Sequence, residues 1–169
     1  MNRFHPAALI CFALLTAPAA AEASEEHFLS TLDGQYEGRG QVRLRTNREP
    51  INVTCSFTSN TSATALSLKG RCRGMLVVSR AVGAELKVTG GSYRGSYLGS
   101  RTGPAALSGQ RKGNTLNLAI RWAKKVNGDR QANLSVARVG ERGLTLTTRD
   151  RDPSTGKMVV TSEIVLKRK

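Results

Sequence analysis

The 169-residue sequence is short of the residue types on which many enzymes and metal proteins depend. It contains two histidines and three cysteines, and 5% of its residues are aromatic. Without the N-terminal leader described below, only His27, Cys55 and Cys72 remain. A structural zinc site needs four ligands, and a nucleophilic triad needs a free nucleophile beside a base. The composition therefore predicts no metal site, no cofactor and no catalytic triad.

Acidic residues are also scarce. The chain has 26 Lys and Arg against 12 Asp and Glu, a net charge of +14. Such a charge attracts polyanions over a Debye length. Candidate partners are anionic lipid head groups, lipopolysaccharide and acidic polysaccharides. No specific nucleic acid is expected, because base-stacking grooves need several aromatic side chains along the path. Solubility alone remains an alternative explanation of the charge.

No apolar run is long enough to span a bilayer as a helix, which takes about 20 residues, so we expect no transmembrane segment. The N-terminus instead has the features of a secretory signal peptide: Arg3, an apolar stretch from Ala7 to Leu15, and small residues ending at Ala21 and Ala23. We expect cleavage near Ala21 or Ala23 and export to the periplasm or beyond. A buried N-terminal helix is the alternative.

Removal of residues 1–23 would leave residues 24–169 as a single domain. Two of its segments alternate strictly, and each carries one cysteine on its apolar face, Cys55 and Cys72. An even cysteine count in an oxidising compartment favours a disulfide, with two free thiols as the alternative. Direct pairing of the two cysteines places the turn of this hairpin at Ala63 and Thr64.

The rest of the chain repeats short alternating segments at a spacing of roughly ten residues, separated by Gly, Asn, Asp and Pro. Two inward rows stand out: Leu116, Leu118, Ile120 and Trp122, and Met158, Val160, Ile164 and Leu166. Ser24–Ser30 is expected to form one helical turn with Ser24 as its N-cap. The pattern predicts an all-β fold, a single small antiparallel β-barrel of about eight to ten strands with a short N-terminal helical turn.

The segment from Leu32 to Gly40 reads Leu-x-Gly-x-aromatic-x-Gly-x-Gly. It resembles the start of small calycin or lipocalin-like barrels. Together with Glu49, Cys55, Cys72, Gly91-x-Tyr93 and Ser108-Gly109, it is similar to a group of exported proteins of Gram-negative bacteria. This resemblance implies a barrel fold and an envelope location, and it implies no activity.

Two basic rows form the first candidate binding surface. The first strand is expected to point Arg39, Arg43 and Arg45 outward, and the third to point Lys69, Arg71 and Arg73 outward. A strip of hydroxyl and amide side chains would lie between them: Asn52, Thr54, Ser56 and Thr58. Arginine binds carboxylate and phosphate groups bidentately, so these rows would suit an anionic lipid or glycan. A solvated outer face is the alternative.

The aromatic side chains form the second candidate site. Inward-facing rings could line a cavity for an apolar ligand, or fill the core: Tyr36, Phe57, Tyr93, Tyr97 and Trp122. A possible carboxylate pair, Asp150 and Asp152, is better explained by turn formation and ion pairing with Arg149 and Arg151.

These features predict a non-enzymatic periplasmic protein that binds an envelope component. The ligand would be an apolar molecule inside the barrel or an anionic lipid or glycan on the basic outer face. The alternative is a structural or accessory protein of the envelope that acts through protein interactions.

Overall fold

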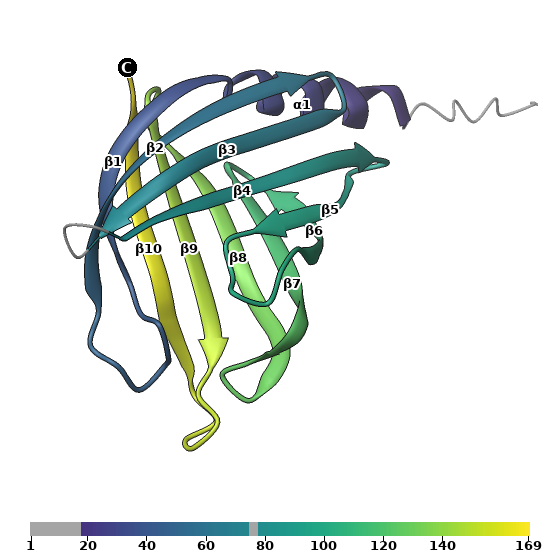
Figure 1. The fold of residues 1–169 in the computed structure, drawn as a ribbon. Helices are drawn as coiled ribbons and strands as arrows, with labels where there is room; N and C mark the ends of the chain where they lie inside the picture. Colours follow the sequence, from purple (N-terminus) through teal and green to yellow (C-terminus); the bar gives the residue numbers. More distant parts are fainter. Residues whose placement is uncertain (1–17, 75–77) are drawn as a thin grey trace, which may run out of the picture.

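The computed structural model describes residues 18–74 and 78–169. One helix precedes ten strands: α1 (Pro18–Ser30), β1 (Gly34–Val42), β2 (Ile51–Ser62), β3 (Ala65–Gly74), β4 (Val78–Thr89), β5 (Ser92–Leu98), β6 (Ala105–Lys112), β7 (Thr115–Val126), β8 (Asp129–Val139), β9 (Gly143–Arg151) and β10 (Met158–Arg168). Every strand pairs antiparallel with its neighbour in the sequence, and β1 pairs with β10. The predicted all-β fold and single closed barrel are confirmed (Figure 1). Closure pairs both edges of the sheet that the described strands form.

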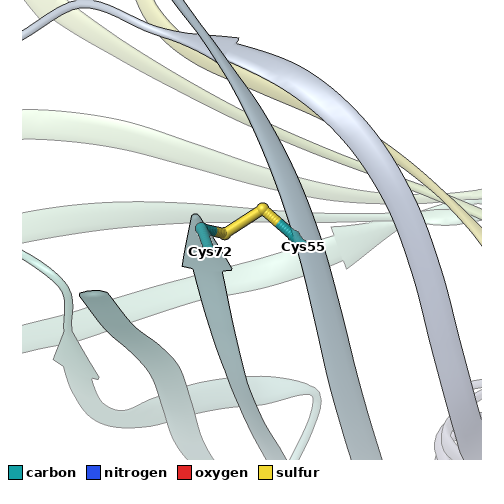
Figure 2. Close-up of a disulfide and its surroundings, with 2 residues drawn as sticks. All are labelled: Cys55 and Cys72. Carbon is teal, nitrogen blue, oxygen red and sulfur yellow. A yellow bond between two sulfur atoms is a disulfide. The ribbon is translucent and has the colours of Figure 1, made fainter. Parts of the chain in front are cut away.

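The predicted β2–β3 hairpin is confirmed in register and in turn position. Cys55 lies directly opposite Cys72, and Ser62 pairs with Ala65 across the two-residue turn. The two cysteines form a disulfide between the strands (Figure 2). Both side chains are buried, with 2% and 7% of their surface exposed, so the disulfide lies on the inner face as the alternation predicts.

The connections between strands alternate between two ends of the barrel. We call the end with the β2–β3, β4–β5, β6–β7 and β8–β9 turns the closed end, because α1 lies across it (Figure 1). The opposite end carries the β1–β2, β5–β6, β7–β8 and β9–β10 connections, and we call it the open end.

The closed half of the barrel holds a dense apolar core. Leu29 and Leu32, on and just after α1, are fully buried, as are Leu116 and Leu144 from the wall. Burying a leucine side chain contributes roughly 1.5–3 kcal/mol. The Tyr36 hydroxyl donates to the Leu32 carbonyl at 3.1 Å and so ties the chain after α1 to the wall.

The N-terminal helix is longer than predicted. It begins at Pro18, so Ser24 lies inside the helix and is not its N-cap. The alanine-rich sequence before Ser24 explains the extension, because alanine has the highest helix propensity. The helix runs through the predicted cleavage sites near Ala21 and Ala23. Residues 1–17 of the predicted signal peptide lie outside the described residues.

Two strands depart from simple alternation near the open end. β1 stops at Val42, because a turn in which the Arg48 N–H donates to the Arg45 carbonyl at 3.1 Å diverts the chain. In β10 the register shifts between Val160 and Ser162. The prediction that Met158 and Val160 point inward with Ile164 and Leu166 is therefore wrong, because these two side chains are 43% and 37% exposed.

Candidate functional site

A cavity of about 1,090 Å³ opens at the open end of the barrel. Side chains from β1, β2, β4, β5, β7, β9 and β10 form its wall, and the β1–β2, β5–β6, β7–β8 and β9–β10 connections surround its mouth. The wall contains two aromatic rings, Tyr97 and Trp122, and several polar side chains, among them Asp150 and Thr161. Its surface is more apolar than polar. The cavity is therefore a cup with an aromatic wall.

Asp150 lies near the end of β9 and points into the barrel, with 3% of its surface exposed. The Thr161 hydroxyl donates to its Oδ2. Thr161 is the residue that the β10 register skips, so the bulge turns this hydroxyl inward. Bulges commonly redirect a side chain in this way next to binding and catalytic sites. The irregularity of β10 thus has a local role in the cavity wall.

Within residues 18–74 and 78–169, four buried side-chain atoms lack a hydrogen-bond partner, and two of them are in this wall, Asp150 Oδ1 and Trp122 Nε1. Burial raises the pKa of Asp150, and the nearby donors Thr161, Asn127 and Trp122 oppose that rise. The indole N–H therefore lies near the carboxylate without reaching hydrogen-bond geometry. Because most buried polar atoms in proteins are paired, two orphaned atoms in one cavity mark it as a candidate binding site.

The aromatic pair is fixed edge to face. The ring centroids of Tyr97 and Trp122 lie 5.8 Å apart at an interplanar angle of 68°. Burial first, and then the charge of Asp150, raises the pKa of Tyr97 to about 12, while Arg80 opposes the shift. Its phenol therefore remains a neutral donor at physiological pH. Arg80 lies opposite the inward-facing Cys72 and brings a cation to the cavity wall.

Cations dominate the lining of the cavity. Six lining residues are basic and three are acidic: Arg43, Arg45, Arg48, Arg80, Arg101 and Lys125, against Glu49, Asp150 and Asp152. None of the three ion pairs found between residues 18–74 and 78–169 involves any of these six cations. The mouth therefore offers free positive charge to an anionic ligand.

The predicted cavity-lining aromatics divide between the two halves of the barrel. Tyr97 and Trp122 line the cavity, whereas Tyr36, Phe57 and Tyr93 are buried in the closed half. Their faces were predicted correctly, but alternation does not give the level along the barrel axis. Phe57 lies over Gly70, where an added Cβ would approach its ring to 2.2 Å.

The Tyr93 hydroxyl donates to Glu25 on α1, so this tyrosine holds the helix against the wall. Tyr93 also borders a second, shallower hollow of about 800 Å³ near the closed end.

The predicted basic rows are only partly present. Arg39, Thr54 and Arg73 are direct neighbours across β1, β2 and β3, and all three are exposed. Arg43 and Arg45 do not continue this outer row, because β1 ends at Val42 and both side chains lie at the cavity mouth.

The remaining members of the third-strand row are engaged by neighbours. Lys69 forms an ion pair with Glu85 at 3.0 Å, and Arg71 donates to Ser79 at 3.4 Å. Of these two cations only Lys69 has its charge compensated, so the outer surface has one free charge fewer than the sequence suggests.

The sequence interpretation missed the polar wall of the cavity. The turn assignment is right for Asp152, which accepts hydrogen bonds from the Ser154 and Thr155 amides. Hydrogen bonds from the Ser154 hydroxyl first, then from the Thr46 side chain and the Thr155 amide, lower its pKa. The turn assignment is wrong for Asp150, which continues the inward row of β9. The alternation of this inward row predicts that Asp150 also points inward: Leu144, Leu146 and Thr148.

Comparison with known proteins supports the fold and no more. No protein-family model matches the sequence, and no curated protein matches it. Among solved structures, the crystal structure of Rv2717c from M. tuberculosis superposes with a TM-score of 0.67 at 17% identity, covering 89% of this chain and 98% of that one. The class is thus a closed antiparallel barrel with a cavity at one end. Between residues 18 and 169, the described segments include no helix long and apolar enough to cross a membrane.

Proposed function

We propose that the protein is an exported, non-catalytic binding protein that holds a small amphipathic anion in the open-end cavity. The observation that carries this proposal is the pair of orphaned atoms, Asp150 Oδ1 and Trp122 Nε1, in the wall of a large cavity. Leaving a buried polar atom unpaired costs roughly 1–3 kcal/mol. A ligand hydroxyl or amide can accept from the indole and donate to the carboxylate, so its binding would recover this energy.

The remaining lining favours a ligand with an apolar body and an acidic group. Ile51, Val126 and the faces of Trp122 and Tyr97 supply apolar surface. The arginines and the lysine at the mouth supply charge, and arginine pairs bidentately with carboxylate or phosphate. The volume is at or just above the upper end of the roughly 300–1,000 Å³ usual for small-molecule sites.

The location and the non-catalytic role are part of the same proposal. The Cys55–Cys72 disulfide favours an oxidising compartment, in agreement with the predicted signal peptide and a periplasmic location. Both cysteines are used in that bond, and His27 lies on α1 at the closed end. Membership of the exported calycin-like barrels of Gram-negative bacteria remains a prediction of the sequence.

An anionic lipid or glycan on the outer basic face is the weaker version of this proposal. Arg39 and Arg73 remain exposed there, but Lys69 is paired with Glu85. Exposed charges also contribute little when they are solvated and screened.

The single tryptophan gives a direct test, because Trp122 lies in the cavity wall. The purified mature chain would be titrated below micellar concentrations with dodecanoate, hydroxydodecanoates and dodecyltrimethylammonium, following Trp122 fluorescence and calorimetry. We expect saturable binding of the anions, tightest for a hydroxylated one, and binding of the cationic amphiphile weaker by roughly tenfold or more, about 1.4 kcal/mol.

Trp122→Phe removes both the optical signal and the indole donor, so calorimetry should show weaker binding of the hydroxylated anion by this variant. Equal affinity for all probes, or no binding by either method, would overturn the proposal. Native mass spectrometry of protein purified from its own compartment would identify a retained ligand.

A further inference from the structure

Exposed apolar side chains gather around the open end. Among the described residues, seven large hydrophobic side chains are exposed: Leu44, Val78, Leu98, Met158, Val160, Val139 and Val165. The first five lie within three residues of a strand terminus at the open end, and Val139 ends β8 at the closed end. Single exposed hydrophobic residues are normal, but their concentration at one end marks an interaction surface.

Basic residues alternate with these apolar side chains along the chain. Leu44, 59% exposed, stands between Arg43 and Arg45, and Met158 follows Lys157. The β5–β6 connection supplies Arg101 shortly after Leu98, which is 48% exposed. Surfaces that rest on anionic membranes combine apolar side chains that enter the head-group region with cations that attract the lipid charge. Each such cation is worth about 1 kcal/mol near the membrane surface.

We propose that the open end docks onto an anionic bilayer surface. The docking residues, which we call the rim, are Leu44, Leu98 and Met158 with Arg43, Arg45, Arg101 and Lys157. Because Arg43, Leu44, Arg45 and Arg101 also line the cavity, docking would turn its mouth toward the lipid. An amphipathic anion could then pass between bilayer and barrel with little exposure of its apolar part to water. This inference rests on the proposed function for its purpose, but the docking itself is measurable separately.

The test is co-sedimentation of the mature chain with vesicles. We expect binding to vesicles of phosphatidylglycerol and phosphatidylcholine mixed, little binding to phosphatidylcholine alone, and weakening by salt. The double variant Leu98→Ser, Met158→Ser, at two rim residues that do not line the cavity, should reduce binding by roughly tenfold or more. Val139→Ser, Val165→Ser is the matched control, since it removes equally exposed apolar side chains away from the rim.

A second pair of variants tests the charges. Arg101→Gln, Lys157→Gln should weaken binding to the mixed vesicles, and Lys112→Gln, Lys167→Gln, which are exposed away from the open end, should not. Circular dichroism and thermal melting of every variant establish that the fold is retained.

The Trp122 titration on the same proteins separates the two proposals. Vesicle binding that is lost in the Leu98→Ser, Met158→Ser variant, which leaves the cavity lining unchanged, while dodecanoate binding persists would support docking. Dodecanoate binding by a wild-type protein that ignores anionic vesicles would overturn docking and leave the cavity function standing. An equal loss in the Val139 and Val165 control, or equal binding to neutral vesicles, would also overturn it.

Discussion

Each end of the barrel contains a buried carboxylate, and the two are held differently. Glu25 on α1 accepts from the Tyr93 hydroxyl and pairs with Arg111 at 2.9 Å. Burial opposes the ionised form of Glu25, but the hydrogen bonds from Arg111 and Tyr93 outweigh it and lower its pKa. Asp150 at the open end has a hydroxyl partner on one oxygen and none on the other, and its pKa is raised.

This contrast distinguishes polar groups that hold the fold together from polar groups that are available to a ligand. At the closed end the charge of Glu25 is paired, so α1 is held in place, although Ser59 Oγ in β2 and Arg138 Nε in β8 are buried in that half without a hydrogen-bond partner. The open end keeps a cavity, an orphaned carboxylate oxygen and an orphaned indole N–H. Unsatisfied polar groups cost stability, and proteins commonly retain that cost at sites that bind something. The two ends should therefore respond differently to truncation, to loss of the disulfide and to a change of pH.

Truncation of the closed-end core should have the largest effect. Leu116→Ala removes a side chain with no exposed surface and should lower the free energy of unfolding by about 2–5 kcal/mol. Leu44→Ala, at a residue 59% exposed at the open end, should change it by less than about 0.5 kcal/mol. Urea denaturation of both variants measures the difference. Similar losses would show that the open end is packed as tightly as the closed one.

Loss of the disulfide should have the second-largest effect on stability. Cys55→Ala, Cys72→Ala frees a loop with a sequence separation of 17 residues and should cost about 3 kcal/mol. Both cysteines lie in the open halves of β2 and β3. Hydrogen exchange should therefore accelerate first around this part of the hairpin, while α1 and its contacts stay protected. Uniform acceleration over the whole barrel would contradict a division into two ends.

The sequence was sufficient for the regular part of the barrel. Strict alternation and one assumed disulfide gave the register of β2 and β3, including the turn at Ala63 and Thr64. It was insufficient where alternation breaks. Met158 and Val160 keep the phase of Ile164 and Leu166, so nothing in the pattern reveals the bulge that turns Thr161 inward.

The level of a residue along the barrel axis was also hidden from the sequence. Tyr93 and Tyr97 share a strand four residues apart, yet the first contacts α1 and the second lines the cavity. Their roles depend on what covers each end, which is a property of the tertiary structure. Asp150 was missed because adjacent Arg and Asp residues suggested a turn, although the strand continues through it.

The contact of α1 with the wall should contribute less than the core or the disulfide. Glu25→Gln keeps the shape of the side chain but removes the negative charge to which Arg111 and Tyr93 donate. It should lower the free energy of unfolding by about 1–2 kcal/mol at pH 7. Because the pKa of Glu25 is lowered in the folded protein, its contribution is present above the ordinary value of 4.5 and is lost as the pH falls through the folded-state value.

Wild-type and Glu25→Gln proteins should therefore converge in stability at low pH, as denaturation across a pH series would show. Glu37→Gln is the matched control, because Glu37 pairs with Lys169 but is 58% exposed in its side chain. Exposed pairs contribute about 0–1 kcal/mol. A pH-independent deficit for Glu25→Gln would mean that its charge does not hold α1.

Asp150→Asn should give the smallest change in the free energy of unfolding, and it should raise this free energy where the other substitutions lower it. Because burial raises the pKa of Asp150, its ionisation weakens the folded state. The stability that protonated Asp150 contributes to the wild type is fully present below the ordinary pKa of 3.8. It is lost as the pH rises through the folded-state pKa. The asparagine variant should therefore be more stable than wild type at neutral pH and equal to it in acid.

Glu163→Gln, exposed on the outer face of β10, is the control for loss of a single negative charge and should show no such pH dependence. Asp150→Asn should also reduce the preference for hydroxydodecanoate over dodecanoate in the Trp122 titration. A variant less stable than wild type at neutral pH would mean that Asp150 anchors the open end as Glu25 anchors α1. The open end would then be a second structural end, and the orphaned atoms would no longer indicate a ligand.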